Sequence, residues 1–139
     1  MITAGVCDSF VLESLTGGVH APDDEYRIAL YSSAANLNPQ TTRYSSGGEI
    51  RAPGYVTGGV ELQNRRTGLV NSDAWLNFDN PTWPNATIAA RGALIYNASK
   101  DNRSVVAMDF GDEVRSTNDL FTVRMPPDGP QAPVVFGRR

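Results

Sequence analysis

The sequence predicts an all-β protein: a jelly-roll-like sandwich or barrel of about seven or eight short strands with one short N-terminal helix. Short segments in which apolar and polar residues alternate recur along the chain. The 13 glycines and nine prolines lie mostly between these segments, as expected at the turns of a chain that runs back and forth. Helical and strand segments do not alternate, which argues against a parallel α/β fold.

The 139 residues are enough for one compact core. We predict a single β domain over residues 1–125, followed by a C-terminal arm or edge strand over residues 126–139. Proline occupies positions 126, 127, 130 and 133, so the segment up to residue 133 is unsuited to a central strand.

A short helix is expected within "CDSFVLESLTGG", where Asp8 or Ser9 can cap the first turn and two glycines follow the last. Its apolar residues Val11, Leu12 and Leu15 are expected to cluster on one side. The following segment, "EYRIALY", alternates apolar and polar residues and predicts a half-buried strand.

The stretch Ser32–Gly48 is rich in Ser, Asn, Pro, Thr and Gly and predicts a long surface loop. Loops of this length in compact domains are often functional. Leu37 and Tyr44 are therefore candidate partner-binding residues.

The middle of the chain predicts a meander of three short strands within "GGVELQN", "TGLVN" and "AWLNF". The next segment, "DNPTWPNAT", is expected to interrupt the sheet because Pro81 and Pro84 lack a backbone N–H. Trp83, between these prolines, is expected to close the rim of the core.

A long hairpin is expected over residues 87–111, with its tip at Ser99–Asn102, and a further strand within "LFTVRM". Arg91 lies in an otherwise apolar strand of this hairpin, and Asp109 is close to the facing position. A cross-strand ion pair between Arg91 and Asp109 is the favoured interpretation, with ligand binding by Arg91 as the alternative.

The charge pattern gives no reason to expect a nucleic-acid partner. The formal net charge is −3, and Lys and Arg are scattered, with adjacent pairs only at Arg65–Arg66 and Arg138–Arg139. No apolar run approaches the ~20 residues needed to span a bilayer, and the first residues lack the pattern of a signal peptide. We therefore expect a protein made in the cytoplasm, with no membrane partner.

Candidate catalytic residues are few. His20 is the single histidine and Cys7 the single cysteine. Ser9 or Ser14 could in principle act with His20, but no nucleophile motif surrounds either serine. Cys7 is interpreted as an apolar filler near the first helix, with a reactive thiol as the alternative.

No cofactor or metal is expected. A transition-metal site of the cupin type would need more histidines. The acidic stretch "APDDE" offers oxygen ligands for calcium but lacks the spacing of a calcium loop. Asp79 and Asp109 are possible paired carboxylates of a glycosidase, although spacing alone does not place them face to face. The sequence thus predicts a protein that is not an enzyme.

Six segments, taken in order, resemble a family of small virion proteins of tailed bacteriophages. They are "GVCDSFVLESLTGGVH", "EYRIALYSSAANL", "TTRYSSGGEI", "GYVTGGVEL", "FDNPTWPNATIAARGALIYNASKDNRSVVAMDFG" and "LFTVRMP", within roughly residues 5–126. The resemblance implies a head cement, or decoration, protein with a jelly-roll-like fold. Its copies would sit on the outside of the head, as dimers or higher clusters, and clamp neighbouring major capsid protein subunits.

A cement protein needs extended segments that reach a neighbour, and the C-terminal segment is the best candidate. Val134, Val135 and Phe136 offer an apolar anchor that could dock on a partner or add a strand to its sheet. The alternative is that these residues pair within their own sheet. The alternative function is a tail-associated receptor or carbohydrate-binding module, with stacking aromatics drawn from Tyr44, Tyr55, Trp75 and Trp83.

Overall fold

The computed structural model of the chain describes residues 1–136 and the side chains of residues 1–135. It is an all-β protein of antiparallel sheets with one short helix, as the sequence predicts. The helix is α1 (Asp8–Leu15), and one turn of 3-10 helix, η1 (Ala98–Lys100), follows later. The strands are β1 (Gly5–Val6), β2 (Tyr26–Tyr31), β3 (Val60–Glu61), β4 (Arg66–Val70), β5 (Asp73–Asn77), β6 (Thr82–Ala86), β7 (Ala89–Asn97), β8 (Arg103–Arg115), β9 (Asp119–Thr122) and β10 (Val134–Phe136).

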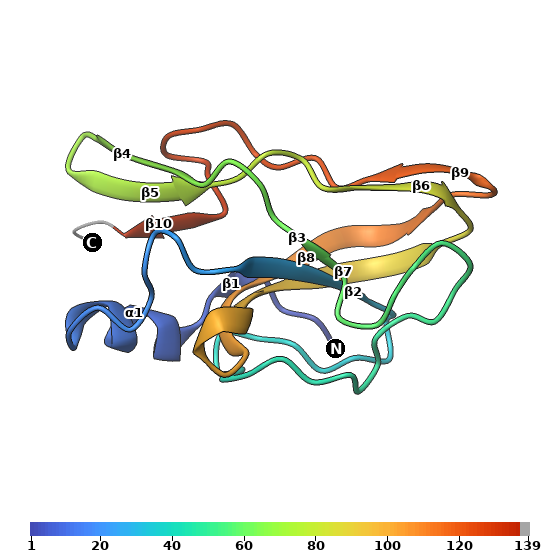
Figure 1. The fold of residues 1–139 in the computed structure, drawn as a ribbon, viewed down its shortest axis with the longest axis horizontal. Coiled ribbons are helices and arrows are strands. Elements are labelled where there is room, and N and C mark those ends of the chain that lie inside the picture. The colour runs from blue at the N-terminus through green and yellow to red at the C-terminus, as the bar shows by residue number, and fades with distance from the viewer. Residues whose placement is uncertain (137–139) are drawn as a thin grey trace.

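The strands form a sandwich-like arrangement around a central sheet. That sheet has the order β1-β8-β7-β2-β3, and the smaller sheets have the orders β10-β5-β4 and β6-β9. The two small sheets lie end to end over one face of the central sheet (Figure 1). On the other side lie α1, at the end near β4 and β5, and the long connection between β2 and β3.

The predicted long hairpin forms the middle of the central sheet. Strands β7 and β8 pair antiparallel, with Ile95 opposite Val106 and Gly92 opposite Asp109. At the tip, Asp101 and Asn102 adopt φ values of 60° and 58°, a conformation that these two residue types tolerate well. Local turn chemistry and the apolar pattern of both strands therefore favour the same pairing.

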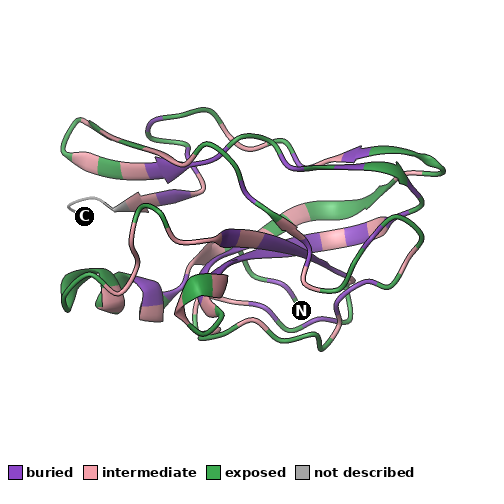
Figure 2. Cartoon of the chain, in the orientation of Figure 1, coloured by how far each residue is buried: buried purple, intermediate pink, exposed green. Residues whose placement is uncertain are grey.

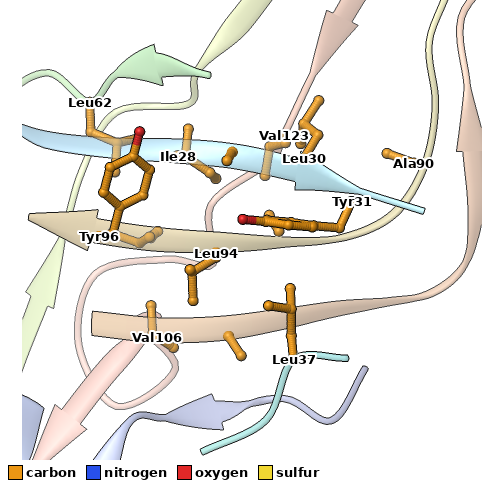
Figure 3. Packing of buried hydrophobic residues seen from close by; sticks show 14 of the residues in the cluster. Ile28, Leu30, Tyr31, Leu37, Leu62, Ala90, Leu94, Tyr96, Val106 and Val123 are labelled. Atoms are coloured by element: carbon orange, nitrogen blue, oxygen red, sulfur yellow. The ribbon is translucent and has the colours of Figure 1, made fainter. Parts of the chain in front are cut away.

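The core lies on both faces of β2 and β7. Ile28 and Leu30 of β2 and Leu94 and Ile95 of β7 have no exposed surface, and Figure 2 shows burial concentrated along these strands. Figure 3 shows the packing of several of these side chains. Burial of each such side chain contributes about 1.5–3 kcal/mol, so the central sheet is the most strongly stabilised part of the molecule.

The predicted surface loop at Ser32–Gly48 is partly a core element, which corrects the expectation. Leu37 is only 5% exposed and forms a parallel bridge with Ile2. The backbone carbonyl of Leu37 accepts a hydrogen bond from Thr3 N–H at 2.8 Å. The loop is buried here because the N-terminal residues pair with its backbone groups.

The proline-containing segment after residue 80 also differs from expectation, because it forms a strand instead of interrupting the sheet. Strand β6 pairs with β9, and its register shifts between Trp83 and Ala86. Pro84 lies within this irregular part, where a missing N–H is tolerated. Trp83 itself is 2% exposed and belongs to the core.

Helix α1 forms where the sequence predicts it, and the apolar residues predicted to cluster on one side of it are exposed. Its buried residue is Phe10, whereas Leu12 and Leu15 are 62% and 79% exposed and Val11 is also exposed. Cys7, at the N-cap, is fully buried. The helix therefore packs through a narrow contact and leaves an apolar side uncovered.

The C-terminal segment pairs within the chain's own sheet, which is one of the two alternatives considered for it. In β10, Val134 faces Leu76 and Val135 faces Trp75 of β5. Upstream, the side-chain amide of Asn77 donates to Pro126 O and to Asp128 Oδ1, both at 2.8 Å. These contacts place residues 126–136 along the edge of the β4–β5 sheet.

Candidate binding groove

A groove of about 500 Å³ opens between α1 and the β10-β5-β4 sheet. This volume falls within the range of small-molecule sites. Its apolar lining residues are Phe10, Tyr26, Leu69, Ala74, Trp75, Leu76 and Val134. Its polar lining residues are Ser14, His20, Arg65 and Thr67.

Trp75 and Gly68 form a cross-strand pair on one wall of this groove. A Cβ atom added at Gly68 would lie 2.7 Å from the indole ring of Trp75. Glycine is therefore required opposite this indole, because any side chain would displace it from its position across the sheet.

His20 lies on the helix side of the groove and both its ring nitrogens are occupied. Nε2 lies 2.8 Å from Glu13 Oε1, and Nδ1 lies 3.0 Å from Nδ2 of Asn97. The imidazole also packs against the ring of Phe10 at a centroid distance of 4.7 Å. Ser14 donates its hydroxyl to the carbonyl of Phe10, so His20 and Ser14 are each engaged with other partners.

Two carboxylates beside His20 are held in ion pairs. Arg103 binds Glu13 at 2.7 Å and Lys100 binds Asp24 at 2.8 Å. Burial raises the pKa of Asp24, but hydrogen bonds from Asn97, Lys100 and the Ala21 N–H outweigh that effect and lower it to about 2. This network joins α1, the turn before β2 and the tip of the long hairpin.

Arg65 differs from the other charged groups in this part of the molecule. Among residues 1–135 no carboxylate forms a salt bridge with it. Its Nε atom is buried and has no hydrogen-bond partner in the described part of the chain. The guanidinium carbon lies 5.9 Å from the centroid of the Tyr26 ring, a cation–π distance. Arg65 thus brings to the groove a positive charge that has no carboxylate partner among residues 1–135.

Arg66, the next residue, is fully engaged. It pairs with Asp79 at 2.7 Å and with Asp128 at 3.0 Å, and its guanidinium also donates to the carbonyls of Asn64 and Phe78. Arg66 therefore fastens the segment before β10 to the β4–β5 hairpin.

A second polar cluster surrounds Glu49, and none of its residues lines the groove. The Glu49 carboxylate accepts hydrogen bonds from the hydroxyls of Tyr44 and Tyr55 and from the Gly58 N–H. Burial, followed by the hydrogen bond to Glu49, raises the pKa of both tyrosines above its usual range. Tyr96 stacks on Tyr44 at a centroid distance of 4.6 Å.

The residues predicted from sequence to bind a partner do not form one site. Leu37 and Val134 are 5% and 3% exposed and belong to the chain's own core. Tyr44 is engaged with Glu49, and Val135 and Phe136 pair with β5. Partner binding by these residues stays a prediction that this arrangement does not favour. Val134 alone among them lines the groove.

Arg91 and Asp109 lie side by side, as predicted for a cross-strand ion pair. Arg91 Nε is 3.1 Å from Asp109 Oδ1, and the same oxygen accepts a hydrogen bond from the Gly111 N–H. The Arg91 side chain is about a third exposed rather than buried. The register of β7 and β8 shifts between Ala90 and Gly92, which places this pair at an irregular point of the sheet.

Comparison with protein-family models, curated proteins and solved structures gives no match for this chain. Within residues 1–136, no group of three or more His, Cys, Asp or Glu residues is arranged to hold a metal ion. The described part of the chain also contains no helix with the length and apolarity required to span a membrane.

Proposed function

We propose that this chain is a structural protein of a bacteriophage particle, a head cement that binds the outside of the capsid and clamps adjacent major capsid protein subunits. It would act by binding rather than by catalysis, as copies joined in a dimer or higher cluster. The identity of the partner rests on the sequence resemblance, and the fold supplies the physical means of binding.

One observation carries the binding role: large apolar side chains are exposed on the two elements that bound the groove, α1 and β4. Leu69 lines the groove and is 76% exposed, and Leu12 and Leu15 are exposed on α1, which forms the opposite wall. Large apolar side chains exposed on neighbouring elements are typical of protein–protein contacts. We call this region, comprising the groove with Leu12, Leu15 and Leu69, the groove end.

The sheet at the groove end supports the same role. Among the described strands, β4 is an edge strand, with one side paired to β5 and no neighbour on its other side in the sheet order. Unpaired edges can accept a strand from a partner. A rigid central sheet would hold this edge and the exposed leucines in a fixed relation, which suits a contact repeated many times over a shell.

Gold-labelled antibody against the purified chain, applied to intact phage particles from the source and viewed by electron microscopy, tests the proposal. Label spread over the head is the expected result. Label confined to the tail would contradict the cement role, and particles without label would contradict the assignment to the virion.

A tail-associated carbohydrate-binding module is the second candidate, and Trp75 favours it. Of the four aromatics considered for sugar stacking, Trp75 alone lines the groove, while Trp83 and Tyr55 are buried. Saturable binding to host surface glycans that Trp75→Ala abolishes, with the fold retained, would favour this function. Unchanged binding in Trp75→Ala would argue against it.

A further inference from the structure

Arg65, a charged residue that lines the groove, has no counter-charge among residues 1–135. Arg65 makes no salt bridge to the described residues, and its buried Nε donates to none of them. The nearby carboxylates are committed elsewhere, Glu13 to Arg103 and Asp24 to Lys100. Because Arg65 lines the groove, an anion bound there would supply the counter-charge that the described chain does not.

The rest of the groove favours an apolar ligand body. Trp75, Leu76 and Val134 form one side and Phe10 lies on the helix side. The polar groups that remain are largely used internally, because the His20 nitrogens and the Ser14 hydroxyl already have partners. A sugar would bring several hydroxyls into a site with few free partners, whereas an aromatic or aliphatic body would bury against the apolar walls.

We propose that the groove between α1 and the β10-β5-β4 sheet binds an organic carboxylate with an apolar body, with the carboxylate paired to Arg65. The guanidinium presents a planar set of donors that matches a carboxylate. Trp75 and Leu76 contact the apolar body. The proposal does not rest on the cement role, because it concerns the purified chain, whose groove no capsid subunit covers.

The test uses isothermal titration calorimetry of the full chain with three probes: 4-phenylbutyrate, its neutral counterpart 4-phenyl-1-butanol, and glucuronate. We expect 4-phenylbutyrate to bind most tightly. In Arg65→Gln its affinity should fall about tenfold or more, the range for a lost hydrogen bond to a charged group. The weaker affinity for 4-phenyl-1-butanol should stay unchanged.

Arg51→Gln is the matched control, because Arg51 is exposed and does not line the groove. It should retain the wild-type affinity for 4-phenylbutyrate. Comparison of the acid with the alcohol on the wild-type chain keeps the test decisive even where Arg65→Gln does not fold.

Equal affinities of the wild-type chain for the acid and the alcohol would overturn the proposal. Binding of glucuronate at least as tight as that of 4-phenylbutyrate would also overturn it and assign the groove to acidic sugars. No binding of 4-phenylbutyrate, together with self-association that Leu69→Asp abolishes, would assign the groove to a second copy. None of these results changes what gold labelling reports about the head, so the two proposals fail separately.

Discussion

The Glu49 cluster and the groove end each place a charged group among aromatic side chains. In the Glu49 cluster, neighbouring groups form hydrogen bonds with the charge, whereas at the groove end no described carboxylate pairs with it. Glu49 accepts hydrogen bonds from Tyr44, Tyr55 and the Gly58 N–H. Arg65 lies over the Tyr26 ring, in the groove that Trp75 also lines, without an anionic partner in the described chain. The first charge ties the long connection between β2 and β3 to the core, whereas the second faces a groove open to ligands.

The two regions are therefore expected to differ in how much their charged group contributes to the free energy of unfolding, with the Glu49 cluster acting as scaffold and the groove end as a binding surface. A buried charge with all its hydrogen bonds made is destabilising to remove, because its partners are left unsatisfied. A charge without a partner contributes little to folding, so its removal changes stability slightly. Removal of a charge beside aromatic side chains is therefore expected to lower stability strongly in the Glu49 cluster and only slightly at the groove end.

Glu49→Ala should have the largest effect on stability. It leaves the Tyr44 and Tyr55 hydroxyls and the Gly58 N–H without their acceptor, and we expect a loss of about 3 kcal/mol in the free energy of unfolding. Urea denaturation measures this loss. Glu61→Ala, at an exposed position of β3, is the control and should change the free energy by less than about 0.5 kcal/mol. Equal effects of the two substitutions would remove the basis of the comparison.

Asp24 should contribute less to the free energy of unfolding than Glu49 does, and its contribution should depend on pH. Its pKa in the folded chain is about 2, below the usual 3.8, so its ionised form stabilises the fold above that usual value. As the pH falls from about 4 to about 2, roughly 2 kcal/mol of stability should be lost from this group. Asp24→Asn should flatten this part of the curve of unfolding free energy against pH, and an unaltered curve would contradict the assigned network.

Arg66→Gln allows a comparison of Arg66 with the adjacent Arg65. The substitution removes the ion pairs to Asp79 and Asp128 that hold the segment before β10. We expect a modest fall in the midpoint of thermal unfolding, since these groups are partly exposed and solvent screens such pairs. A midpoint equal to that of the wild type would show that the Arg66 contacts do not fasten this segment.

Arg65→Gln should have the smallest effect on stability. Its guanidinium has no anionic partner among the described residues, so the free energy of unfolding should change by less than about 0.5 kcal/mol. Thermal and urea unfolding measure this directly. A loss larger than that of Arg66→Gln would mean that Arg65 belongs to the scaffold and would break the comparison.

The parts of the fold that follow from local pattern could be predicted from the sequence. The β7–β8 hairpin combines two apolar strands with Asp and Asn at the turn, and both signals point to one structure. Strand β6 was missed because proline disfavours regular pairing, and only the register shift beside Pro84 makes a strand possible there. The sequence predicts Leu37 at the surface, and the structure differs because its partner, Ile2, is distant in sequence.

The groove end could not be predicted from the sequence. Arg65 and Arg66 are adjacent and chemically identical, and the difference between them depends on Asp79 and Asp128, which tertiary structure brings to Arg66 alone. The exposure of Leu12 and Leu15 has a similar origin, because an apolar pattern on a short helix predicts burial only where another element covers it. The role of Glu49 could not be predicted, because nothing around a single acidic residue in a polar loop indicates that tyrosine hydroxyls will donate to it.

The most direct test of the proposed role of the groove end is cosedimentation of the purified chain with phage heads from the source. Leu15→Asp combined with Leu69→Asp alters the groove end, and Leu120→Asp alters an exposed leucine on β9, at the opposite end of the molecule (Figure 1). We predict that the wild-type chain and Leu120→Asp sediment with heads and that the double variant stays in solution while remaining folded. Equal cosedimentation of all three chains would contradict the assignment of binding to the groove end.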